Sequence, residues 1–298
     1  MKTIKTFLKS HPVLTYFALT FAISWGGMLL VMVAVPGGFP GTREQVETRL
    51  NFAMLAWTAG PPLAGILLTG LLYGREGFRN LLTRMTRWRV GARWYAVALL
   101  SAPLLFMVVP LALSLRSPEF LPGIFTTSDL AYVLLFGIGW GLIGGGLLEE
   151  LGWTGFAVPT LLRMRYGVLG TGLIVGVLWG ALHFPVFVFA SDTYSGALPL
   201  AIYLPAYLFI LLVGGLPAYR VLMVWVYDRS GGSLLLAMLM HASYTAFTFI
   251  LGPLALAGVG LLIYDLVLAA ALWVFVAAVA VATHGHLSRQ PPQRKRVA

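Results

Sequence analysis

The stretch AYVLLFGIGWGLIGGGLLEE, residues 131–150, carries no charge until its last two positions, the adjacent acids Glu149 and Glu150. An uncharged apolar run of this length predicts a helix that crosses a membrane. Apolar sequence resumes beyond the acids, so both carboxyl groups are expected in hydrophobic surroundings. A charged carboxylate near a bilayer centre costs roughly 2.5–3.5 kcal/mol on insertion scales. We therefore expect the functional site of this protein at these two acids.

The composition excludes an ordinary soluble domain, because 59% of the 298 residues are hydrophobic and only 10% are charged. Eight apolar stretches are long enough to cross hydrocarbon as helices. They lie near residues 13–35, 52–73, 94–115, 129–149, 168–190, 199–219, 232–251 and 256–282. The runs are continuous rather than alternating, so we expect an all-α polytopic membrane bundle of about eight transmembrane helices. Residues 1–298 are predicted to form a single membrane-embedded domain, with a motif-bearing core at about 129–251.

The basic residues that give the chain its net charge of +10 are distributed among the predicted loops and are not gathered in one patch. Basic residues gather before the first span, in alternate loops and in the tail, at Lys2, Lys5, Lys9, 75–93, Arg163, Arg165, Arg220, Arg229 and 284–298. Because cytoplasmic loops carry the excess of Lys and Arg, both termini are predicted in the cytoplasm, with 284–298 as a basic cytoplasmic tail. We expect these segments to touch anionic membrane lipids and not nucleic acid. Residues 74–93 are expected to form an amphipathic helix on this interface.

The adjacent acids point in directions that differ by roughly 100° on a helix. One of the pair is therefore expected to act as a general base, while the other orients it or bonds a neighbouring helix. The alternative is that both lie at the cytoplasmic end of their span and reach water. A further acid, Asp265, lies within the eighth span.

Two later spans hold one interior histidine each. Gly172, Gly176 and Gly180 form a stripe of small residues that lets another helix approach, and His183 continues that face. His183 is therefore expected to face protein, and its alternative role is an ordinary interhelical hydrogen bond. Trp179, one turn earlier, is expected to serve for packing.

The seventh span has a narrow polar face, made by His241, Thr245 and Thr248 with Tyr244 beside them. Such a stripe needs partners inside the bundle. Its imidazole and hydroxyl groups can donate hydrogen bonds to a developing oxyanion, whereas a threonine can also bond its own helix.

Several chemistries are excluded by missing residues. The chain has no cysteine, no His-Glu-x-x-His, no Gly-x-Ser-x-Gly and no nucleotide-binding glycine loop. Glu149, His183 and His241 are a possible ligand set for a divalent metal such as zinc. No compact ligand motif is present, so a metal-free site without a cofactor is expected.

Three motifs resemble, in order and approximate spacing, those of the CAAX prenyl endopeptidase and bacteriocin-processing (CPBP) family, also called ABI proteins. They are Glu149-Glu150-Leu-Gly-Trp-Thr154-Gly155-Phe156, Trp179-x-x-x-His183 and His241-x-x-x-Thr245. The likeness extends to Gly60-Pro61-Pro62 and to residues 88–95. It implies a bundle of eight helices around a conical cavity open to the cytosol.

The resemblance also implies roles for individual residues. Glu149 and His183 would activate water, Glu150 would support the site, and His241 with Thr245 would stabilise an oxyanion. The family pattern has arginine where this chain has Thr154, and asparagine where it has Thr245. Loss of the arginine removes a cation that could hold Glu150 or its partner Glu149 ionised, and threonine is a shorter donor than asparagine.

We therefore expect an intramembrane endopeptidase that hydrolyses a membrane-associated peptide or lipidated protein, either prenylated or bacteriocin-like. One alternative is an inert membrane scaffold or immunity protein of the same family. Another is a proton-coupled transporter with a relay of buried acids and histidines. The lack of corresponding broken helices in two halves of the chain counts against the transporter.

Overall fold

A computed structural model describes residues 2–34 and 52–288. Within these residues, eight helices are long and apolar enough to cross a membrane, as predicted. They span Pro12–Ala34, Phe52–Met85, Ala92–Ser114, Leu130–Arg163, Gly167–Phe189, Leu200–Arg229, Leu234–Leu251 and Gly258–Ala282. The described residues contain no strand, so the all-α fold class is confirmed. Two parts of the sequence-based prediction lie outside the described residues. They are the charged residues of the loop between 35 and 51, and residues 289–298, which make up most of the predicted tail.

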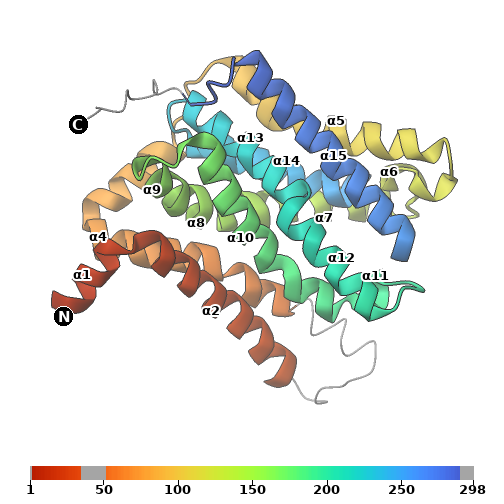
Figure 1. The fold of residues 1–298 in the computed structure, drawn as a ribbon, viewed down its shortest axis with the longest axis horizontal. Coiled ribbons are helices and arrows are strands. Elements are labelled where there is room, and N and C mark those ends of the chain that lie inside the picture. Colours follow the sequence, from red (N-terminus) through yellow and green to blue (C-terminus); the bar gives the residue numbers. More distant parts are fainter. Residues whose placement is uncertain (1, 35–51, 289–298) are drawn as a thin grey trace, which may run out of the picture.

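Figure 1 shows the order of the elements along the chain. The first part holds α1 (Lys2–Ser10), α2 (Pro12–Ala34), α4 (Gly60–Met85), α5 (Ala92–Ser114), η1 (Pro118–Phe120) and α6 (Gly123–Thr126). The motif-bearing fourth span is built from α7 (Leu130–Trp140), η2 (Gly141–Glu149), α8 (Glu150–Gly152), η3 (Trp153–Ala157) and α9 (Val158–Arg163). The rest comprises α10 (Gly167–Phe189), α11 (Ser191–Tyr194), α12 (Leu200–Val213), α13 (Gly215–Arg229), α14 (Leu234–Leu251) and α15 (Gly258–Ala282).

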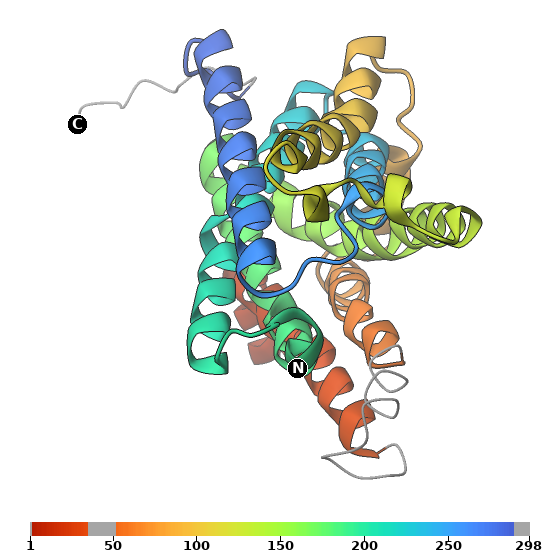
Figure 2. The same ribbon diagram turned by 90° about the vertical axis from the view of Figure 1, so that its right-hand side faces the viewer.

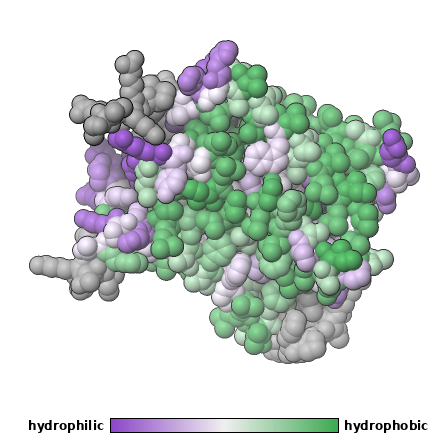
Figure 3. All heavy atoms as spheres, in the orientation of Figure 1, coloured by the Kyte–Doolittle hydropathy of each residue, from purple (hydrophilic) through white to green (hydrophobic). Residues whose placement is uncertain are grey.

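The outer surface of the bundle is apolar. Figure 3 shows hydrophobic residues across the broad face, with hydrophilic residues gathered mainly towards the left end and a smaller group at the right edge. Large apolar side chains such as Leu135 (76% exposed) and Val274 (68% exposed) point outward. A surface of this kind suits contact with lipid chains, so the protein is an integral, multi-pass membrane protein.

The second apolar stretch continues as a helix past its predicted end near residue 73. Gly74 has φ 58° and ψ −144°, a conformation that a residue with a Cβ atom rarely adopts, and it kinks α4. Beyond the kink the helix runs to Met85, with Leu81 buried and Leu82 exposed. The predicted amphipathic helix is therefore present, but it ends at Met85 and not near residue 93.

The fourth span also continues beyond its predicted end, from residue 149 to Arg163. The glycine-rich η2 and the later η3 are π-helical, and wide turns of this type often mark functional sites. Glu149 closes the first π-helical segment and Glu150 opens α8. The two acids therefore lie at a transition in helix type inside the span.

The helix α13 lies at the centre of the bundle, and most of its side chains are buried. The stripe of Gly172, Gly176 and Gly180 on α10 faces this region. A Cβ atom on Gly172 would lie 2.6 Å from Cα of Val221, and one on Gly176 would lie 2.6 Å from Cα of Pro217. The prediction that small residues permit close helix approach is confirmed. The last helix, α15, also lies along α12 and α13 (Figure 2).

Candidate active site

A cavity of about 320 Å³ lies inside the bundle, and residues from all three motifs line it. Four of the predicted site residues are among its walls: Glu149, His183, His241 and Thr245. Glu150 does not line it. The remaining walls are largely aromatic, and they extend to Tyr194 of α11. Because α11 follows the end of α10, it lies at the end of the bundle opposite the Arg163 end of the fourth span (Figure 1).

Glu149 presents a carboxyl group that is anchored through one oxygen. Its Oε2 accepts hydrogen bonds from Nε1 of Trp153 at 3.0 Å and from Nε1 of Trp179 at 2.9 Å. Within the described residues no donor is bonded to Oε1. The indoles therefore fix the position of the carboxyl group while one oxygen stays available to a molecule in the cavity.

Glu150 has a different set of partners and no exposure. Its Oε1 lies 2.7 Å from Nη1 of Arg220 and 2.7 Å from Nδ1 of His241, and Oε2 accepts a hydrogen bond from the Thr154 hydroxyl. Glu149 is only 5% exposed and Glu150 is fully buried. The two acids thus point to different partners, as helical geometry predicts, and the alternative that both simply reach water is wrong.

Arg220 is the largest departure from the sequence-based interpretation, which placed it in a loop as a topology signal. It lies inside α13 with no exposure, paired with Glu150. Its guanidinium also lies 4.3 Å from the ring centroid of Trp179, a cation–π contact. The prediction failed because the sixth span continues to Arg229 after a break at Gly214. The isolated cation between the apolar runs 215–219 and 221–227 was the available signal.

His183 is oriented by its own helix. Its Nδ1 lies 2.8 Å from the backbone oxygen of Trp179. A carbonyl oxygen can only accept a hydrogen bond, so Nδ1 carries the proton and Nε2 is left to accept one. The ring packs edge-on against Trp57, with 4.7 Å between centroids. His183 is therefore set to bind a polar molecule in the cavity through Nε2.

His241 is held by Glu150 in the pattern of a carboxylate-oriented imidazole. Because Nδ1 donates to that carboxylate, Nε2 faces the other side of the ring, towards η2. A Cβ atom at Gly145 would lie 3.0 Å from Nε2 of His241 and would also meet the Thr245 hydroxyl. The absence of a side chain at Gly145 thus lets η2 approach this part of the cavity wall.

Trp179 links these groups, although the sequence indicated only packing for it. Its indole donates to Glu149, its carbonyl accepts from His183, and its ring lies 4.8 Å from that of His241. The four-residue spacing between Trp179 and His183 was the sequence signal for the contact of His183 with the Trp179 carbonyl. The bond to Glu149 could not be foreseen, since it joins residues on two different spans.

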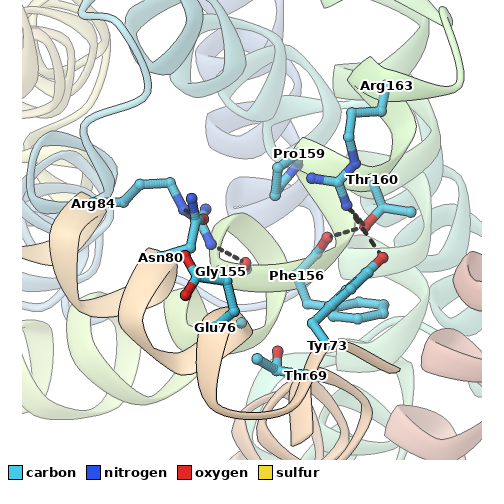
Figure 4. A pocket seen from close by; sticks show the side chains of 11 residues that line it. Thr69, Tyr73, Glu76, Asn80, Arg84, Gly155, Phe156, Pro159, Thr160 and Arg163 are labelled. Atoms are coloured by element: carbon cyan, nitrogen blue, oxygen red, sulfur yellow. Dashed lines mark hydrogen bonds between the residues drawn. The ribbon is translucent and has the colours of Figure 1, made fainter. Parts of the chain in front are cut away.

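A second cavity, of about 330 Å³, lies on the other side of the motif segment, and none of the predicted site residues line it (Figure 4). At its edge Arg84 donates from Nη2 to the Gly155 oxygen at 2.7 Å and from Nη1 to the Thr154 oxygen at 3.1 Å. Its Nε also bonds Asn80 at 2.9 Å. Arg84 therefore ties the amphipathic half of α4 to the backbone that follows the two acids.

The possible ligand set of Glu149, His183 and His241 does not form a metal-binding group. Within residues 2–34 and 52–288, no three His, Cys, Asp or Glu side chains are placed to hold a metal ion together.

The described residues thus form a helical bundle with eight candidate spans, in which Glu149, His183 and His241 line one internal cavity. Residues 131–247 match the family model of type II CAAX prenyl endopeptidases, described as Rce1-like. This segment contains all three motifs, and the match agrees with the family resemblance predicted from them. Over these residues the chain is similar to membrane proteases of the CAAX type. No curated protein matches the chain significantly.

Proposed function

We propose that this protein is an intramembrane endopeptidase in which Glu149 acts as the general base that activates water. The observation that supports this most is the shared cavity of Glu149, His183 and His241, which come from three separate spans. Proton transfer requires groups within hydrogen-bond reach of the water or one water molecule away. A single cavity with these three groups in its wall supports the proposal that they act on one water molecule.

In the proposed reaction, Oε1 of Glu149 takes a proton from a water molecule that Nε2 of His183 orients. The hydroxide attacks the carbonyl carbon of the scissile peptide bond and forms a tetrahedral intermediate. Glu149 then passes its proton to the leaving nitrogen, the C–N bond breaks, and an amine and a carboxylic acid are released; transfer of the acid's proton to the amine gives the carboxylate and ammonium products. The two indole bonds to Oε2 keep the carboxyl group in one orientation throughout.

The oxyanion of the intermediate requires donors on the opposite side of the carbonyl. We assign one of these donors to Nε2 of His241, whose Nδ1 is bonded to Glu150. Arg220 pairs with the same carboxylate. Thr245, in the same wall, supplies a second donor.

The family match favours a membrane-anchored, prenylated peptide as the substrate, and a bacteriocin-like peptide is the alternative. The largely aromatic walls of the cavity are compatible with an apolar peptide segment.

The inert-scaffold alternative rests on threonine in place of the family's arginine at Thr154 and in place of its asparagine at Thr245. In this chain the cation that pairs with Glu150 is Arg220, from another helix, so Glu150 has a cationic partner without an arginine at position 154. This pairing favours a working site over a degenerate one.

The test uses purified protein in proteoliposomes with farnesylated and unlipidated versions of a membrane-anchored peptide library. Cleavage is read by mass spectrometry, and an internal pH-sensitive dye reports proton flux. The proposal predicts cleaved products without peptide-dependent flux. Flux without cleavage would support the transporter, and the absence of both would support the scaffold.

A further inference from the structure

The cavity contains a second carboxyl group that the proposed reaction does not use. Asp265 of α15 lines the same cavity as Glu149, although it lies beyond the segment that matches the family model. Its Oδ2 accepts a hydrogen bond of 2.6 Å from the Tyr207 hydroxyl of α12. In the part of the chain that the structure describes, no Lys, Arg or His forms an ion pair with Asp265.

Aromatic side chains form the wall beside this acid. The ring of Phe187 stacks on that of Tyr207 with 4.1 Å between centroids, and it lies 5.9 Å from the ring of Tyr194. Tyr264 precedes Asp265 in the chain and also lines the cavity. Several ring faces and one carboxyl group are thus gathered in one region of the wall.

This combination selects for positive charge. A carboxylate within a membrane-spanning segment is costly unless a cation or donors compensate it, and one tyrosine hydroxyl compensates it only in part. Aromatic faces attract ammonium and guanidinium groups through their negative ring faces. An apolar ligand group would gain nothing from the acid, whereas a cationic group would supply its missing partner.

We propose that Asp265, with Phe187, Tyr194 and Tyr207, forms a subsite that binds a lysine or arginine side chain of the peptide substrate. The subsite and the proposed general base share one cavity, so the bound cation determines which peptide bond is presented to Glu149. This inference rests on the proposed function for its substrate class. Asp265 is a specificity-determining residue and takes no part in bond cleavage.

The competing explanation is a structural bond between α12 and α15. The variant Asp265→Asn distinguishes the cation subsite from this structural role. Its amide oxygen can still accept the hydrogen bond from Tyr207, but the negative charge is removed. Asp192→Asn is the matched control, since Asp192 is an exposed acid on α11 at the same end of the bundle. A structural role would leave the substrate preference of Asp265→Asn unchanged.

The experiment compares kcat/KM for peptide pairs that carry either lysine or its uncharged analogue norleucine at each position flanking the cleaved bond. We expect wild-type protein to prefer lysine at one position by about 10- to 100-fold, the range for a hydrogen-bonded charge. The preference should disappear in Asp265→Asn and persist in Asp192→Asn. Equal turnover of the two peptides by wild-type protein would overturn the inference even if the variant did not fold.

A binding measurement separates this inference from the proposed peptidase activity. The dissociation constants of the lysine and norleucine peptides are measured on the Glu149→Gln variant by fluorescence anisotropy. Tighter binding of the lysine peptide, lost on adding Asp265→Asn, would support the subsite even if no peptide were cleaved. Equal binding of both peptides would contradict it, whatever the cleavage assay showed.

Discussion

Nη1 of Arg220 lies 2.7 Å from Oε1 of Glu150, and neither side chain is exposed. The two residues come from α13 and from the motif-bearing span. In the family pattern the cation would follow the acids on their own helix, at the position of Thr154. Here a hydroxyl occupies that position and bonds Glu150, while the positive charge comes from a neighbouring helix. The pair therefore couples the stability of the bundle to the position of His241.

Removal of this cation should destabilise the protein strongly. The variant Arg220→Met removes the arginine partner of the buried Glu150 carboxylate, and breaking a buried ion pair in this way typically costs about 3–5 kcal/mol. Thermal unfolding in detergent should show a large fall in Tm. Arg89→Met, at an exposed arginine, is the control and should unfold close to wild type.

The double variant Arg220→Met with Glu150→Gln removes both charges. Its loss of unfolding free energy should be smaller than the sum of the losses in the two single variants, because the effects of contacting residues are coupled. Strict additivity would show that the ion pair contributes nothing to stability.

Restoration of the family's arginine at position 154 should harm this protein. Thr154 is 2% exposed, so a long cationic side chain would be forced into packed surroundings beside Arg220. We expect Thr154→Arg to lower both the Tm and peptide cleavage, and Arg220→Met to recover part of the loss in combination. Higher activity of Thr154→Arg alone would show that Arg220 does not replace the family's cation.

Gly145 should be required for the geometry of the cavity wall. A Cβ atom there would lie 2.9 Å from Cδ2 of His241, so Gly145→Ala should displace the imidazole or η2. A displacement of about 1 Å can cost 10²-fold in rate, and we expect kcat to fall by about that factor. Gly139→Ala is the control, because a Cβ atom there meets nothing within 4 Å. Equal kcat for both variants would argue against this role of His241.

The orientation in the membrane stays a prediction from charge, and the lack of cysteine makes it directly testable. Single-cysteine variants Arg89→Cys and Arg116→Cys lie in consecutive connections, on opposite sides of the third span. A membrane-impermeant maleimide should label Arg116→Cys from outside intact cells and Arg89→Cys only in inverted vesicles. The reverse pattern would place the termini outside the cytoplasm.

Much of the fold was predictable because each span must satisfy its own backbone hydrogen bonds, which leaves a readable apolar run in the sequence. The motif residues were predictable because an acid or imidazole within such an apolar run costs free energy unless it has a partner or a function. Arg220 was misplaced, since its partner Glu150 lies 70 positions away and no local pattern joins them. The kink at Gly74 and the π-helical turns around Glu149 depend on tertiary packing and left no periodic signal.

The proposed mechanism depends most on Glu149 as the group that accepts a proton from water, and the variant Glu149→Gln tests this role directly. Glutamine has the same shape and can still accept the indole bonds of Trp153 and Trp179 through its amide oxygen, but it is a very weak base. With a peptide that the wild-type protein cleaves, kcat should fall by about 10²- to 10⁴-fold, the usual contribution of a general base. Glu76→Gln, at an exposed acid of α4, should leave kcat unchanged. An unchanged kcat in Glu149→Gln would contradict the proposed mechanism.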